Sequence, residues 1–191
     1  MAQTKVTEKV INGVNVNKLH DAIVTCRDNP EMAVFKFRAM NRWVCGGHCS
    51  TTIQDFYGLG REDTTRSKPF VLEADEPEAL LGEDYGPNAT EAVLYALSSC
   101  LVTTCIYHAA AHGIKIDQLE LDLEGELDLR GFLGISDDIR RGYQNIKAVF
   151  RIKSDAPREK LEQAMQMAQK YSPVFDIVTN KVPVTAELQT L

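Results

Sequence analysis

The sequence has too little positive charge for a protein that binds nucleic acid. Its 21 lysines and arginines are outnumbered by 27 aspartates and glutamates, which gives a formal net charge of −6. Recognition of a phosphate backbone needs a basic stripe or patch, and the sequence contains none. No tract is dominated by proline, glycine or serine either, so we expect an ordered globular chain.

The first ten residues, MAQTKVTEKV, lack the apolar run and the cleavage site of a signal peptide. The cysteines are odd in number and do not follow the spacing of a disulfide framework. Both observations favour a cytoplasmic protein with free thiols. The five cysteines are Cys26, Cys45, Cys49, Cys100 and Cys105.

Charge is absent from one long stretch: no Asp, Glu, Lys or Arg occurs between Ala92 and Ala111. Apolar residues occupy nearly every helical angle there, which predicts a helix buried on most of its surface. Asn88 and Glu91 have the spacing of a capping box, and Gly113 stands where a C-terminal cap belongs. The run has the length of a membrane span, but its serines, threonines and acidic flanks argue against one.

Periodicity predicts the other elements, in the order helix, three strands, central helix, two strands, two helices and one strand. Segregated strands and helices indicate an α+β fold with a mainly antiparallel sheet. The segment 130–142 is expected to be a solvated loop, with a lid or a dimer contact as the alternative. The expected helices cover 16–28 and the residues after Pro157 and Ser172, and the expected strands cover 33–44, 50–53, 70–74, 114–129, 143–153 and 182–188.

Two groups of residues raise the question of a metal. Cys45, His48 and Cys49 flank a Gly-Gly turn and form half of a zinc-like ligand set, with a thiol redox pair and an incidental turn as alternatives. Cys105, His108 and His112 have the spacing of one helix face, although histidines near a helix C-terminus also interact favourably with the helix dipole. Neither group is a complete ligand set, so we expect no metal and no cofactor.

The stretch from Gly86 to Cys100, GPNATEAVLYALSSC, resembles the signature helix of the OsmC/Ohr family, the osmotically inducible and organic hydroperoxide resistance proteins. Residues 109–113 and 171–174 (YSPV) add to the resemblance, which covers about residues 33–188. It implies an OsmC-like domain at 33–191 preceded by a helical extension at 1–32. It also implies an intertwined homodimer with two interfacial sites, in which a cysteine pair reduces organic hydroperoxides.

Carried over residue by residue, the resemblance places the peroxide-attacking cysteine at Cys100. The second, resolving cysteine falls on Ser172, so this sequence lacks it. The acidic residue that orients an arginine falls on Thr90, with Glu91 as its neighbour and substitute. That arginine should lie in the first strands, where Arg42 or Arg38 could serve.

Helix geometry limits what these residues can do alone. A thiolate attacks peroxide, and the helix dipole acts only in the first turn, so Cys100 needs a cation from elsewhere. Glu91 is about 13 Å from Cys100 along the axis. Cys105 is about 140° round the helix and cannot form an intrahelical disulfide with Cys100. An external thiol would therefore have to reduce a sulfenic acid on Cys100.

Two hypotheses follow. The first is a homodimeric redox protein that reduces apolar hydroperoxides through Cys100, assisted by Arg42, with an external thiol as its reductant. The second is a non-catalytic binder of an apolar small molecule in the same interfacial pocket, suggested by Ser172 and Thr90. The sequence leaves open whether the chain is an enzyme, and it predicts neither a nucleic-acid nor a membrane partner.

Overall fold

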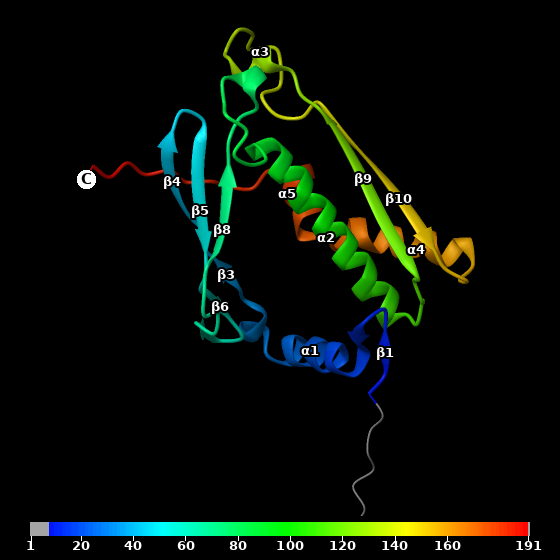
Figure 1. Ribbon diagram of the computed structural model, residues 1–191. Coiled ribbons are helices and arrows are strands. Elements are labelled where there is room, and N and C mark those ends of the chain that lie inside the picture. The colour runs from blue at the N-terminus through cyan, green and yellow to red at the C-terminus, as the bar shows by residue number, and fades with distance from the viewer. Residues whose placement is uncertain (1–7, 191) are drawn as a thin grey trace, which may run out of the picture. The chain divides into compact units, whose positions relative to one another are not determined.

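The computed structural model describes residues 8–190 (Figure 1). These residues divide into two compact units. The first unit contains residues 8–9 and 15–93, and the second contains residues 10–14 and 94–190. Each unit is considered by itself.

The first unit carries short strands in two antiparallel sheets, with the strand orders β3-β6-β7 and β4-β5-β8. Helix α1 precedes them, and the Asn15 side chain caps it by accepting a hydrogen bond from the Lys18 N–H. The elements are α1 (Val16–Asp28), η1 (Pro30–Ala33), β3 (Lys36–Phe37), β4 (Met40–Cys45), β5 (His48–Ile53), β6 (Phe56–Gly58), β7 (Arg61–Asp63), β8 (Phe70–Ala74) and η2 (Glu78–Leu80).

The predicted Gly-Gly hairpin is confirmed, because Gly46 and Gly47 join β4 to β5. Gly46 has φ of +52°, a left-handed conformation that glycine adopts without strain. One prediction here was wrong, because the expected strand at 33–44 is two strands that pair in different sheets. Residues 61–63, outside every expected strand, form β7.

The second unit contains a long hairpin, β9–β10, and three longer helical segments (Figure 1). The short β1–β2 turn at 10–15 runs across the boundary between the units. The Asn12 amide fixes this turn to the segment after α2, since it donates to the Ile114 carbonyl at 2.9 Å and accepts from the Ile116 N–H at 2.8 Å. The elements are β1 (Val10–Ile11), β2 (Val14–Asn15), α2 (Ala89–Ala111), β9 (Gln118–Glu126), α3 (Leu129–Phe132), β10 (Asn145–Lys153), α4 (Arg158–Tyr171) and α5 (Pro173–Thr179).

One hydrophobic cluster holds the second unit together. Residues 97, 101, 105 and 109 form a buried stripe at four-residue spacing on α2, which packs with Ala164 and Ala168 of α4. Alternate residues of β9 face the cluster, and acidic residues occupy the opposite face of the strand. The predicted alternation is therefore confirmed, over 118–126 rather than 114–129. The hairpin register pairs Leu121 with Phe150 and Leu119 with Ile152.

Helix α2 is less buried than its composition predicts. Its buried residues are Leu97, Leu101, Cys105, Ala109 and Ala110, whereas Tyr95 and Tyr107 are exposed. By length and composition the helix could cross a membrane, but core helices of soluble proteins have the same properties. One side of α2 belongs to the hydrophobic cluster with α4 and the β9–β10 hairpin, and the other side is uncovered within residues 8–190.

The last prediction to fail is the strand at 182–188. Residues 181–190 have no regular secondary structure and make no hydrogen bond with any part of the chain from 8 to 190. Val184 and Leu188 are almost completely exposed. A strand exists only when it is paired, so an alternating pattern at a chain end is not sufficient to form one.

Candidate functional site

Two cysteines lie on α2, and they differ in burial. Cys105 is completely buried in the hydrophobic cluster, and burial raises the pKa of its thiol to about 11. Cys100 is five residues earlier and only partly buried. Because the thiolate is the reactive form, Cys105 is an inert core residue and Cys100 is the accessible thiol of this helix.

This difference predicts selective alkylation. With its pKa at about 11, only about one Cys105 thiol in ten thousand is ionised at neutral pH, and the fraction rises only as the pH approaches 11. We expect iodoacetamide to label Cys100 but not Cys105 in the folded protein, and both in denaturant, with mass spectrometry of peptides as the readout. Equal labelling of the two in the folded protein would contradict the placement of Cys105 in the core.

The N-terminus of α2 is held by the predicted capping box. Asn88 Oδ1 accepts from the Glu91 N–H at 2.9 Å, and Glu91 Oε2 accepts from the Asn88 N–H at 2.9 Å. Thr90 donates its hydroxyl to the same Asn88 oxygen. The Glu91 carboxylate, nine residues before Cys100, therefore has a structural role as the partner of the Asn88 N–H. Its role toward an arginine stays a prediction.

Asn88→Ala should lower the free energy of unfolding by about 1 kcal/mol, because it removes the N-cap acceptor. Glu91→Gln keeps an acceptor for the Asn88 N–H and should leave stability unchanged in urea denaturation. If capping is its only role, Glu91→Gln also keeps wild-type peroxide reduction. A loss of activity at unchanged stability would assign the carboxylate to an arginine instead.

The structure distinguishes the two candidate arginines. Arg38 forms a bidentate ion pair with Glu62, with both N–O distances at 2.8 Å, and the hydrogen bonds that Arg38 donates to Glu62 raise the pKa of Arg38. The Arg42 guanidinium forms no ion pair or hydrogen bond with any residue of the described range 8–190. Arg42 is thus the arginine whose donors are available to a substrate or a thiolate.

Arg42 belongs to a polar row across the β4-β5-β8 sheet that the sequence did not reveal. It pairs with Ser50, which pairs with Glu73, so the three side chains share one face. Glu73 accepts from Ser50 Oγ and binds His48 Nε2, both at 2.9 Å. The hydrogen bonds from His48 and then Ser50 lower the pKa of Glu73, which stays ionised. The only sequence signal was a charged residue inside the apolar strand Phe70–Ala74.

The loop after β8 is organised by the buried carboxylate of Asp75. It accepts from the N–H groups of Glu76 at 2.8 Å, Glu83 at 3.0 Å and Tyr85 at 3.5 Å. Burial alone would raise the pKa of Asp75, but the backbone donors of Glu83, Glu76 and Tyr85 outweigh it and lower the pKa. The loop is therefore held rigidly beside His48, whose ring stacks on Tyr85 with centroids 4.7 Å apart.

Ser172 connects α4 to α5 and is buried. Its N–H donates to the Ala168 carbonyl at 3.0 Å, and its Oγ accepts from the Phe175 N–H at 3.1 Å. Ser172 therefore ends one helix and caps the next. Its hydroxyl has a structural role, and no thiol is present at this position to resolve an oxidised Cys100.

Neither candidate metal group comes together as a ligand set. Within residues 8–190 there is no cluster of three or more His, Cys, Asp or Glu side chains able to hold a metal ion. Cys105 lies in the core, whereas the His108 ring stacks on Tyr171 with centroids 4.8 Å apart. Cys45 and Cys49 lie on either side of the register shift in β4–β5.

A family model of OsmC-like proteins matches residues 82–187, more than half of the chain. The chain belongs to the OsmC-like protein family. No curated protein matches this OsmC-like chain.

Solved structures share the OsmC-like fold at low sequence identity. An OsmC-like protein from Mycoplasma pneumoniae superposes with a TM-score of 0.60 at 16% identity, over 76% of this chain and 89% of the other. The organic hydroperoxide resistance protein OsmC from Legionella pneumophila superposes with a TM-score of 0.52 at 16% identity, over 76% of this chain and 90% of the other. At such identities the likeness establishes the fold.

Proposed function

We propose that this OsmC-like chain reduces organic hydroperoxides through Cys100, with an external thiol as the resolving agent. The observation that carries the proposal is the accessibility of Cys100 on the family helix, next to a core that buries the other helix thiol. The name of the Legionella pneumophila protein, an organic hydroperoxide resistance protein, supports the same class of substrate.

The chemistry needs only thiols and the peroxide. The Cys100 thiolate attacks one peroxide oxygen, the O–O bond breaks, and the alkoxide leaves as an alcohol after taking a proton. Cys100 is then a sulfenic acid. One external thiol condenses with it to a mixed disulfide and water, and a second thiol releases Cys100 and forms the external disulfide. Two external thiols are oxidised for each peroxide reduced.

Arg42 is the proposed cation of this reaction. A guanidinium stabilises the attacking thiolate and the negative charge that develops on the leaving oxygen. The unpaired state of Arg42 within residues 8–190 supports this assignment, and the ion pair of Arg38 with Glu62 argues against the alternative. Ser172 leaves the resolving step to a thiol from solution.

Cys100→Ser should abolish peroxide consumption, because the nucleophile is lost, while Cys26→Ser should leave it unchanged. Cumene hydroperoxide and dithiothreitol are suitable probes, with peroxide loss measured directly and a dimedone adduct at Cys100 detected by mass spectrometry. Arg42→Lys should reduce the rate and Arg38→Lys should not. A Cys100 that reacts no faster than free cysteine would refute the proposal.

A second candidate function is the binding of an apolar small molecule without turnover. The absence of a thiol at Ser172 favours it, as do the many exposed apolar side chains. Native mass spectrometry of the purified protein should then show a retained ligand or uptake of an added fatty acid. If the protein binds none of these compounds and does reduce peroxide, the binding function is contradicted and peroxide reduction remains.

We further propose a homodimer as the functional state. The first unit contains no buried hydrophobic residue within its described range, and Phe37 and Trp43 are 72% and 71% exposed. The uncovered side of α2 carries Tyr95 and Tyr107 but no charge from 92 to 111. Exposed apolar surface of this extent marks an interface, and the unpaired segment 181–190 offers strand-forming residues to a partner.

Analytical ultracentrifugation should give twice the 21.3 kDa of one chain. Tyr95→Arg should raise the monomer fraction, because it buries an unpaired charge in the proposed interface. Glu120→Arg, on the exposed acidic face of β9, is the matched control and should leave the dimer intact. A stable monomer at all concentrations would contradict this proposal.

A further inference from the structure

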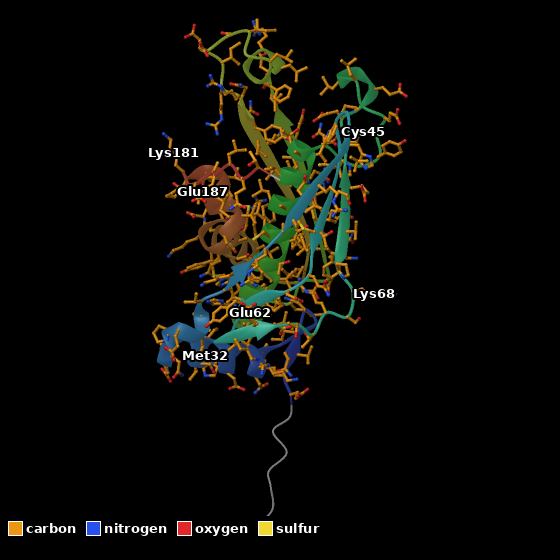
Figure 2. All side chains as sticks on the ribbon, turned by 90° about the vertical axis from the view of Figure 1, so that its left-hand side faces the viewer. Met32, Cys45, Glu62, Lys68, Lys181 and Glu187 are labelled. Carbon is orange, nitrogen blue, oxygen red and sulfur yellow. The ribbon has the colours of Figure 1, made fainter. Side chains whose placement is uncertain are left out.

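The hairpin Cys45-Gly46-Gly47-His48 places a second thiol beside an imidazole. Cys45 is exposed at the end of β4 (Figure 2). Its direct cross-strand partner is His48, the first residue of β5. Side chains at directly opposed positions have their Cβ atoms about 5 Å apart, so the thiol and the imidazole are neighbours.

Glu73 determines which nitrogen of His48 carries the proton. Its Oε2 lies 2.9 Å from His48 Nε2. The hydrogen bonds from His48 and Ser50 lower the pKa of this carboxyl, and an ionised carboxylate can only accept. Nε2 is therefore the donor, and Nδ1 is left as the acceptor of the neutral ring. Nδ1 forms no hydrogen bond with any residue in the described part of the chain.

The other charged groups around His48 are already compensated. Asp75, which follows β8, is held by three backbone N–H groups. Glu83, from the loop before α2, interacts with the Tyr85 hydroxyl, and this hydrogen bond raises the pKa of Tyr85 and keeps it neutral. The Tyr85 ring stacks on the imidazole. The ring is thus fixed by Glu73 at one edge and by Tyr85 on one face.

We propose that Cys45 is a second reactive thiol, which exchanges with low-molecular-weight disulfides, with His48 as its base and Glu73 as the residue that positions His48. This arrangement is nucleophile, base and orienting carboxylate, and it is built from three strands of one sheet. It is independent of Cys100 and of the proposed peroxide chemistry.

The exchange is balanced without any further reactant. The Cys45 thiol passes its proton to His48 Nδ1, and the thiolate attacks one sulfur of the disulfide. The S–S bond breaks, a mixed disulfide forms on Cys45, and the leaving thiolate takes the proton from His48. The product is a protein carrying a reversible thiol cap, plus one equivalent of free thiol.

Two other cysteines, which are less exposed than Cys45, provide comparisons without a neighbouring imidazole. Cys49 pairs with Trp43 and Ala74 and lies in a different row from His48. Cys26 lies on α1. Both are partly buried free thiols that lack a cross-strand histidine.

The test uses the full chain with Cys100→Ser, oxidised glutathione as the probe and mass spectrometry of peptides as the readout. Cys45 should acquire glutathione at least about tenfold faster than Cys26 or Cys49. His48→Gln should slow the reaction at Cys45 by about 100-fold, the usual contribution of a general base. Ser50→Ala removes the hydrogen bond from Ser50 to Glu73 but keeps the one between His48 and Glu73, so it should change the rate at Cys45 little.

The positioning role of Glu73 has its own readout. Long-range 1H–15N spectra should show His48 with its proton on Nε2, and Glu73→Leu should change the tautomer and slow the exchange at Cys45. The wild-type spectrum keeps the proposal testable even if a variant fails to fold. Modification of Cys45 no faster than Cys26, or a His48 proton on Nδ1, would overturn it.

Discussion

The packing of α2 against α4 is the contact on which the second unit and its chemistry depend. Leu101 and Cys105 of α2 belong to one buried hydrophobic cluster with Ala164 and Ala168 of α4. Five residues correspond to about 140° of rotation round a helix. The register that buries Cys105 therefore leaves Cys100 partly exposed. One packing contact thus decides which thiol is inert and which is available for reaction.

Availability is not sufficient for reactivity, because nothing on α2 supplies a positive charge near Cys100. The cation has to come from another segment or from another chain, and of the two candidate arginines Arg38 is paired with Glu62, whereas Arg42 has no side-chain partner within residues 8–190. Residues 8–9 and 15–93 of the first unit also include no buried hydrophobic residue. A dimer would meet both needs, since it would cover the apolar side chains and assemble the thiol with an arginine. Stability and catalysis would then depend on the same association.

The parts of the fold that the sequence predicted correctly are those with long, local signals. The capping box and the charge-free run defined α2, and strict alternation defined β9. The short strands β6 and β7 were missed because three residues carry no periodicity, and tertiary pairing alone makes them strands. The choice of Arg42 over Arg38 depended on Glu62, which is 24 residues away from Arg38. The hydrogen bond between His48 and Glu73 joins residues 25 positions apart, so it could not be predicted from the sequence either.

The central claim is that Cys100 reacts with peroxide with the help of an arginine. A crystal structure of the assembled protein, grown with reduced thiols, tests it most directly through the distance between Cys100 Sγ and the nearest guanidinium nitrogen. The account predicts Arg42 within hydrogen-bond reach of that sulfur. A Cys100 surrounded only by apolar side chains, with Arg42 in solvent, would contradict it.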